Sequence, residues 1–227
     1  MKIGILQTGH FPDALQGAEG DYEVMFSRLL DGHGFTFHTW SVVDMVFPDG
    51  PRDADGWLIT GSRHGAYEDL PFIPPLEALI RSIYAEGVPM VGVCFGHQII
   101  AQALGGRVEK VAAGWEVGRK EYDWQGERVA LNAWHQDQVV DVPRGAKVIA
   151  SHPRCDVAAL VYDTRIWTVQ AHPEFRDSAI VGLADTRGRG VVPDPLLETA
   201  KAETNKGTDH QWIAHQMADF LKGKVAA

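Results

Sequence analysis

The sequence predicts an α/β fold: a mostly parallel central sheet with helices on both faces, together with a small antiparallel sheet. In the first half of the chain, short apolar runs alternate with segments of helical periodicity, and the connections between them are short. This alternation is typical of parallel strands joined by covering helices, and it favours a flavodoxin-like strand order. In the second half, apolar runs follow one another with few helices between them, which indicates antiparallel hairpins.

Four apolar runs are the expected parallel strands. They are Ile3–Leu6, Phe35–Trp40, Gly56–Thr60 and Val88–Val93. Between them, Asp21–Asp31 has apolar residues at near-helical spacing and stops before Gly32. Pro74–Ala85 begins at a proline pair and ends at Gly87, which is typical of a helix with a glycine after its last turn. We expect these two helices to cover the sheet.

Six strand-like runs make up most of the second half. They are Arg107–Val111, Val117–Trp124, Arg128–Leu131, Lys147–Ala150, Val157–Tyr162 and Ile166–Val169. The polar segment Asp163–Arg165 is expected to be the hairpin turn between the last two. Leu196–Glu203 and His210–Leu221 then have helical spacing, whereas Thr186–Pro195 is rich in Gly, Arg and Pro and is expected to be a surface loop.

Composition and charge limit the classes of function. A chain of 227 residues with 45% hydrophobic content can form one substantial core, so we expect a single domain over residues 1–227, with 177–227 as a variable helical extension. The formal net charge of −9 and the lack of a Lys/Arg cluster exclude nucleic acid or a membrane surface as the principal partner. Two cysteines do not make a disulfide framework, and a reactive thiol needs a reducing compartment, so a cytoplasmic location is expected.

The most informative motif is the strand-to-helix turn at Cys94. Residues 89–98 read Pro-Met-Val-Gly-Val-Cys-Phe-Gly-His-Gln. Gly92 and Gly96 fit a nucleophile elbow, because only residues without bulk can flank so sharp a bend. The helix expected over His97–Leu104 directs the partial positive charge of its N-terminus at the sulfur, which favours the reactive thiolate. A buried structural cysteine is the alternative, but it does not account for both glycines.

A cysteine nucleophile needs a base, and the base needs a third group that fixes its tautomer. His172 and Glu174 supply both groups, since they lie two residues apart at the end of an apolar run and a continued strand would point them to one side. Pro173 stiffens the backbone between them. Without the elbow, His-Pro-Glu would be interpreted as a polar loop after a strand. Cys155 lies in a turn-like stretch with no such partners and is expected to be structural.

The elbow at Cys94, followed far downstream by His172-Pro173-Glu174, resembles the class I glutamine amidotransferase family. The resemblance covers most of the chain, from Met1 to about Phe175. It implies that Cys94 attacks the γ-carboxamide of glutamine or a related γ-glutamyl compound, that His172 transfers protons and that Glu174 orients His172. A cysteine variant of the α/β-hydrolases would instead place its acid before its histidine.

Relatives of the intracellular cysteine peptidase and chaperone type form another class with a similar elbow. They usually have histidine directly after the nucleophile, where this chain has Phe95. This difference counts against them.

The oxyanion formed on attack needs preorganised donors, and the Phe95 N–H at the elbow is one candidate. A second candidate lies in the small-residue loop that contains Gly61 and Ser62, which would otherwise be interpreted as an ordinary turn. The resemblance implies that Gly61 or Ser62 gives the second donor. Because Cys94 and this loop both follow the carboxyl ends of strands, we expect them to face one crevice. His64 is expected to be solvated rather than a second base.

Substrate-binding residues are implied by the resemblance alone. Gln98, one turn into the helix after the nucleophile, matches the position that contacts the amino-acid end of the glutamyl group. The segment Trp134-His135-Gln136-Asp137 resembles the family's substrate loop, in which backbone groups and the acid hold the substrate. From the residues themselves, Gln98 as a helix surface residue and Asp137 as a turn former stay open.

No cofactor and no metal are expected. His210 and His215 are five residues apart on a predicted helix, off the i,i+4 face that paired ligands need. The sequence has no Gly-x-x-x-x-Gly-Lys-Ser/Thr phosphate loop. The expected partner is therefore a small-molecule substrate.

The resemblance implies a γ-glutamyl thioester on Cys94 and release of glutamate and ammonia from glutamine. The local sequence is similar both to the glutaminase half of GMP synthetase and to stand-alone γ-glutamyl peptidases, so cleavage of γ-glutamyl conjugates is the alternative. With no synthetase domain in the sequence, the chain is expected either to feed a synthetase partner or to work alone. A non-catalytic regulatory module would be expected to lack a triad residue, and all three are present.

Overall fold

A computed structural model describes residues 1–224, which form eleven strands and seven α-helices. The strands are β1 (Lys2–Gln7), β2 (Thr36–Ser41), β3 (Gly56–Ile59), β4 (Met90–Val93), β5 (Arg107–Lys110), β6 (Glu116–Trp124), β7 (Glu127–His135), β8 (Asp137–Asp141), β9 (Lys147–His152), β10 (Cys155–Tyr162) and β11 (Ile166–Val169). The helices are α1 (Asp13–Glu19), α2 (Tyr22–Leu29), α3 (Ile73–Glu86), α4 (Phe95–Ala103), α5 (Asp177–Asp185), α6 (Asp194–Ala202) and α7 (His210–Leu221), with a 3-10 turn, η1, over Val42–Asp44.

The central sheet has nine strands in the order β2-β1-β3-β4-β11-β10-β9-β6-β7. The first five are parallel, in the 2-1-3-4-5 order of flavodoxin-like folds, which confirms the predicted fold class. Strands β10, β9, β6 and β7 extend the same sheet in antiparallel pairing, and β5 and β8 form a separate antiparallel pair. The predicted hairpin turn over residues 163–165 joins β10 to β11.

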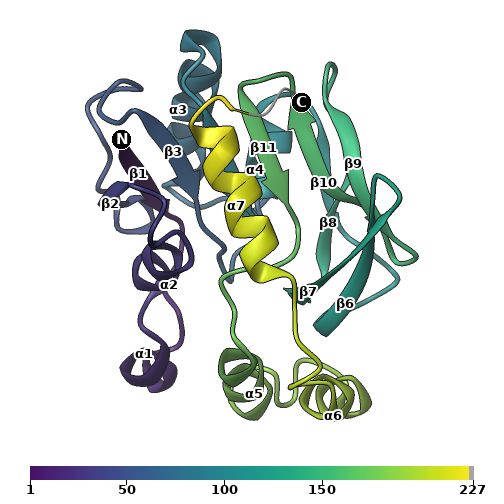
Figure 1. The fold of residues 1–227 in the computed structure, drawn as a ribbon. Coiled ribbons are helices and arrows are strands. Elements are labelled where there is room, and N and C mark those ends of the chain that lie inside the picture. The colour runs from purple at the N-terminus through teal and green to yellow at the C-terminus, as the bar shows by residue number, and fades with distance from the viewer. Residues whose placement is uncertain (225–227) are drawn as a thin grey trace.

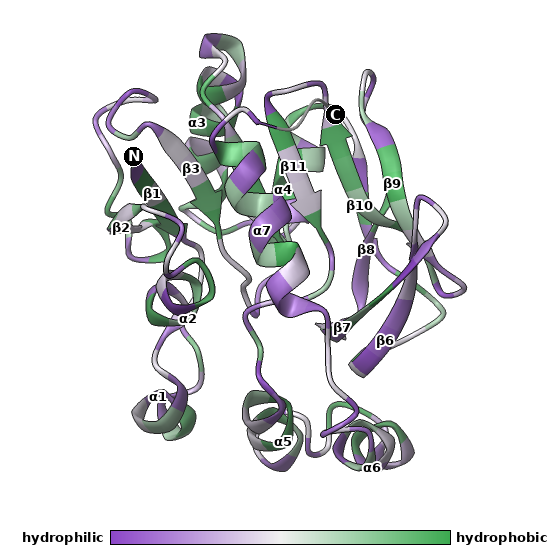
Figure 2. Ribbon diagram, viewed as in Figure 1, coloured by the Kyte–Doolittle hydropathy of each residue, from purple (hydrophilic) through white to green (hydrophobic). Residues whose placement is uncertain are grey.

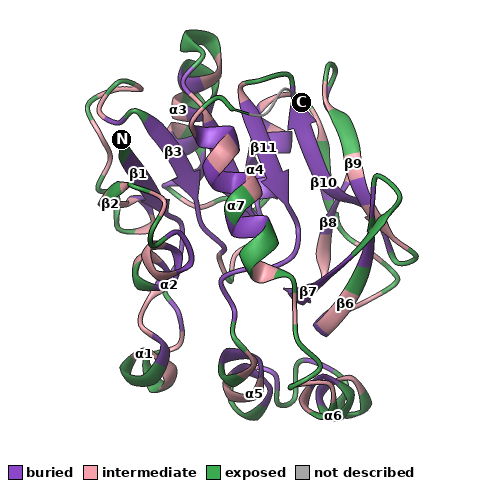
Figure 3. Cartoon of the chain, in the orientation of Figure 1, coloured by how far each residue is buried: buried purple, intermediate pink, exposed green. Residues whose placement is uncertain are grey.

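Helices lie on both faces of the parallel half of the sheet. Figure 1 shows α7 in front of the sheet, α3 and α4 behind it, and α1, α5 and α6 beyond the edge toward which β3 and β11 point. Every residue of β3 and β4 is buried, as expected for parallel strands covered on both sides. Figure 3 shows that the central strands are buried. Figure 2 shows the apolar character of β10.

Helix α1 and strand β8 were not predicted, and α5 was expected only as an unspecified part of the helical extension. Helix α1 contains Gly17 and is followed by Gly20, which lowers its intrinsic helix propensity, so it depends on packing: the Leu15 side chain reaches Gly182 of α5. Helix α5 lies in the extension, and β8 begins at the polar Asp137 in a segment expected to be a loop. The turn-like stretch around Cys155 is the turn at residues 153–154, after which Cys155 begins β10, and its burial agrees with the expected structural role.

Candidate active site

The elbow at Cys94 has the geometry that its glycines predict. Strand β4 ends at Val93, helix α4 begins at Phe95, and Cys94 between them has φ 52° and ψ −103°. A positive φ is uncommon for a residue with a side chain, and such strained positions cluster at functional sites. A Cβ on Gly92 would lie 2.6 Å from Ile100 Cδ1 and 2.7 Å from the Gly96 backbone, so the bend has no room for a side chain there.

Substituting Gly96 by alanine is expected to destabilise the protein. The added Cβ would overlap the carbonyl oxygen of Ile59, which belongs to the backbone of β3 and cannot swing away. Overpacking of this kind costs about 1–3 kcal/mol of the free energy of unfolding, which urea denaturation measures. Gly17→Ala is the control, because its Cβ would meet no atom within 4 Å; it should lose no stability and should gain up to about 1 kcal/mol from the higher helix propensity of alanine. Equal midpoints for Gly96→Ala and the wild-type protein would contradict this account of the elbow.

His172 and Glu174 lie in a turn that follows β11. The strand ends at Val169, so the expected continuation of the strand through His172 was wrong, and an isolated bridge to Asn132 holds His172 instead. His172 Nδ1 is 2.6 Å from Glu174 Oε1, and both side chains are almost completely buried. The ring of Phe175 stacks on the imidazole at 4.0 Å between centroids. These contacts fix the ring plane and leave Nε2 free to face another group.

The protonation of His172 follows from its charged neighbours. Burial lowers the pKa of His172, but the nearby charges of Glu174 and of an ionised Cys94, with the hydrogen bond to Glu174, raise it to about 10. Cys94 and His172 line the same cavity, so the sulfur and the imidazole are neighbours. The sequence-predicted Cys94, His172 and Glu174 are therefore brought together as a chain of three interacting side chains.

One backbone N–H at the elbow is available as an oxyanion donor. Phe95 starts α4 directly after Cys94, and its N–H has no acceptor within residues 1–224. The neighbouring Gly96 N–H donates a hydrogen bond to the Thr60 carbonyl oxygen at 3.1 Å and is therefore not available to a substrate. A Cβ on Gly61 would lie only 2.9 Å from His172 Cε1, so the loop after β3 passes directly beside the imidazole. These positions agree with the predicted crevice shared by the two strand ends.

A cavity of about 420 Å³ opens onto Cys94 and His172. Of the predicted residues, it is also lined by Ser62, Gln98, Trp134, His135, Gln136 and Asp137. Phe95 and Glu174 are buried beside it, where Phe95 can contribute only its backbone and Glu174 acts through His172. His64 lines the cavity as well, but its Nδ1 is 3.3 Å from Glu68 Oε2.

The predicted substrate segment is a corner between two strands rather than a loop. Trp134 and His135 end β7, and Asp137 begins β8. The Gln98 side chain is buried and donates to the Asp137 carbonyl oxygen at 2.8 Å, so it ties this corner to helix α4. The Asp137 carboxylate accepts a hydrogen bond from Tyr67 at 3.1 Å, and burial raises its pKa. Burial lowers the pKa of His135 to about 3, which keeps its imidazole neutral at physiological pH.

Two groups of residues at the site were missed by the sequence analysis. Gln170 is fully buried, accepts a hydrogen bond from Gln98 at 3.1 Å and donates to Cys94 Sγ at 3.7 Å. Its position two residues before His172 is the signal that could have identified it. The second group comes from the start of α2 and from the C-terminal extension, and it includes Tyr22, Leu183, Arg187, Val191 and Val192. Nothing in the local sequence places these residues at the cavity.

Within residues 1–224, no cluster of three or more His, Cys, Asp and Glu side chains has the arrangement of a metal site. None of the helices described there combines the length and apolar character needed to cross a membrane.

Comparison with known proteins agrees with this geometry. Residues 50–180 match the profile of the family described as "Glutamine amidotransferase class-I". The chain is 28% identical over 221 residues to γ-glutamyl peptidase 4 of Arabidopsis thaliana, covering 89% of this chain and 88% of that protein. It is 38% identical over 218 residues to the glutamine-hydrolysing GMP synthase of Clostridium novyi, covering 92% of this chain but only 38% of that protein.

A solved structure, that of a glutamine amidotransferase from Methylobacillus flagellatus, shares the fold. The TM-score is 0.73 with 23% sequence identity, over 100% of this chain and 96% of that one. The sequence match and the shared fold lead to one conclusion: this chain belongs to the class I glutamine amidotransferase family.

Proposed function

We propose that this protein is a cysteine-dependent hydrolase of γ-glutamyl amides that works through a thioester on Cys94. The observation that carries the proposal is that Cys94 and His172 line one cavity large enough for a small molecule, with His172 hydrogen-bonded to the buried Glu174. Nucleophile, base and orienting acid in this order are the minimum for covalent acyl transfer.

The proposed reaction begins when the Cys94 thiolate attacks the γ-carbonyl carbon. The C–S bond forms, and the carbonyl oxygen becomes an oxyanion that receives hydrogen bonds from the N–H groups of Phe95 and of Gly61 or Ser62. The raised pKa of His172 keeps it protonated until it transfers its proton to the departing nitrogen. The C–N bond then breaks and leaves a γ-glutamyl thioester. Water, deprotonated by His172, attacks this thioester and releases glutamate and the free thiol.

The glutamyl group is proposed to lie against the corner between β7 and β8. The Asp137 carboxylate and the backbone from Trp134 to Gln136 line the cavity there and would meet the amino-acid end of the substrate. The side chain of Gln98 holds this corner in place by donating a hydrogen bond to the Asp137 carbonyl oxygen.

Glutamine is the first candidate substrate, and γ-glutamyl conjugates are the second. The second is favoured by the part of the cavity wall formed by Leu183, Val191 and Val192 of the extension together with Trp115. Ammonia leaving from glutamine has no apolar group that such a wall could contact. The amine side of a γ-glutamyl peptide or conjugate has one, and its burial would contribute to binding.

The test is a panel of glutamine and γ-glutamyl amides of increasing apolar size, scored for glutamate release. Val191 is 59% exposed, so Val191→Asp should fold normally while it places a charge on the apolar wall. We expect the ratio of kcat/KM for an apolar conjugate to that for glutamine to fall about 10-fold, which corresponds to ~1.4 kcal/mol of transition-state binding. An unchanged ratio would remove the support for the second candidate, and no glutamate release from any compound would contradict the proposed function.

Three further points are proposed with this function. If glutamine is the substrate, ammonia would pass to a separate synthetase partner, and activation by such a partner would distinguish this case from a stand-alone hydrolase. We also propose a cytoplasmic location, which suits a reduced Cys94. Finally, we propose one domain over residues 1–227 with 177–227 as its extension, of which 225–227 lie outside the described residues.

A further inference from the structure

The buried side chain of Tyr22 brings its hydroxyl group to the reacting end of the cavity. The side chain is 3% exposed and lines the cavity together with Cys94 and His172. A Cβ on Gly61 would lie 3.6 Å from the Tyr22 hydroxyl oxygen and 2.9 Å from His172 Cε1, so both groups approach Gly61 from the side on which a side chain would stand. The hydroxyl oxygen is therefore beside the loop proposed to hold the oxyanion.

The hydroxyl has no protein partner within residues 1–224, where Tyr22 takes part in a side-chain hydrogen bond only through its backbone N–H. Because Tyr22 lines the cavity, its hydroxyl can form a hydrogen bond with water or with a bound substrate.

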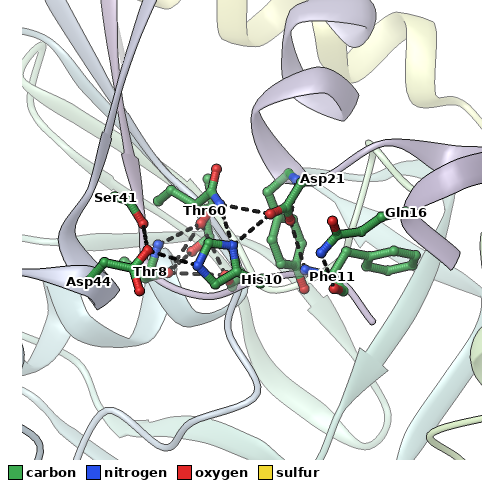
Figure 4. Close-up of polar contacts among 11 residues, drawn as sticks. Thr8, His10, Phe11, Gln16, Asp21, Ser41, Asp44 and Thr60 are labelled. Carbon is green, nitrogen blue, oxygen red and sulfur yellow. Dashed lines mark hydrogen bonds and ion pairs between the residues drawn. The ribbon is translucent and has the colours of Figure 1, made fainter. Parts of the chain in front are cut away.

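The ring is held rigidly. Asp21 Oδ1 accepts hydrogen bonds from the backbone N–H of Tyr22 at 2.8 Å and of Phe11 at 2.7 Å, and Asp21 Oδ2 contacts His10 at 2.7 Å. Figure 4 shows the Asp21 carboxylate between His10 and Phe11. Phe175, which stacks on His172, also stacks on the Tyr22 ring at 6.3 Å between centroids. One aromatic cluster therefore orients both the imidazole and the phenol.

The phenol stays protonated. Burial, together with the negative charges of Glu174 and Cys94, raises the pKa of Tyr22 well above its ordinary value. A neutral hydroxyl in this place can donate a hydrogen bond to developing negative charge, at a fixed position and without reorganisation.

We propose that Tyr22 is a further catalytic residue, whose hydroxyl donates a hydrogen bond to the γ-carbonyl oxygen as this oxygen becomes an oxyanion. The inference rests on the proposed γ-glutamyl hydrolysis. It adds a side-chain donor to the backbone donors of Phe95 and of the loop at Gly61, and it transfers no proton.

The test is the Tyr22→Phe variant, which keeps the ring and its packing. Loss of one oxyanion donor costs about 10²-fold in kcat, so we expect that loss with KM changed less than about threefold. The rate of Cys94 alkylation by iodoacetamide should equal that of the wild-type protein, because the pairing of Cys94 with His172 is unchanged. A merely structural role would instead change the alkylation rate or the urea midpoint.

Tyr162→Phe is the matched control. Tyr162 is also buried and its hydroxyl also lacks a hydrogen-bond partner, but it lies in the other core cluster, away from the cavity. It should keep wild-type kcat. A Tyr22→Phe variant with wild-type kcat, or with a defect in KM alone, would overturn the inference while the wild-type activity upholds the proposed function. A wild-type protein that releases no glutamate would overturn both.

Discussion

Replacing Cys94 with alanine is expected to lower kcat/KM for γ-glutamyl amides by about 10⁴–10⁶-fold. The sulfur forms the proposed covalent intermediate, and the remaining donors and binding contacts would supply only a small residual rate. Glutamate release, measured with the best substrate of the panel, gives the comparison.

Cys155→Ala is the matched control for this loss. Cys155 is buried at the start of β10, and burial raises the pKa of its thiol to about 12, so it is neither accessible nor ionised at neutral pH. This variant should retain wild-type kcat/KM. Activity that survives in Cys94→Ala and disappears in Cys155→Ala would contradict the assignment of the nucleophile.

Glu174→Gln is expected to lower kcat about 10⁴-fold, because an amide cannot stabilise a protonated His172 or select its tautomer as a carboxylate does. The Glu174 side chain is completely buried, and glutamine preserves its size, so the variant tests charge rather than packing. KM should change little, since Glu174 does not line the cavity. A variant with more than about a tenth of the wild-type kcat would show that Glu174 is not the orienting acid.

The same variant is expected to change the dependence of stability on pH. The pKa of His172 is about 10 in the folded protein, above its ordinary value of 6.5, so the folded state binds its proton more tightly than the unfolded state does. The stabilisation by this group is present in full below about pH 6.5, and it is lost as the pH rises toward about 10. In Glu174→Gln, no carboxylate offsets the effect of burial, so the pKa of His172 falls. The loss of stability between pH 6.5 and 10 should then disappear. Urea denaturation between pH 6 and 10 measures the difference.

The fold could be predicted because its strongest signals are local. The apolar runs that became β1, β3 and β4 and the glycines around Cys94 are determined by neighbours in the sequence. The contact between His172 and Glu174 was expected too, although a turn after β11 produces it rather than a continued strand. Short-range chemistry therefore identified the candidate triad residues before any tertiary contact was known.

What could not be predicted depends on long-range packing. Helix α1 is short and contains glycine, and only its contact with α5 explains why it forms. Tyr22 comes from the start of α2 and Val192 from the extension, yet both reach the cavity because the chain folds back over the carboxyl edge of the sheet. Gln170 appears in the sequence as one more residue of a buried run, and only the structure shows its amide against Cys94.

The most direct test of the central claim is to trap the intermediate. We would mix the protein with its best γ-glutamyl substrate, quench with acid during turnover and map the peptides by mass spectrometry. The account predicts one glutamyl group on the peptide that contains Cys94, lost on treatment with hydroxylamine and absent from Cys94→Ala. Turnover without any adduct on Cys94, or an adduct on Cys155, would contradict it.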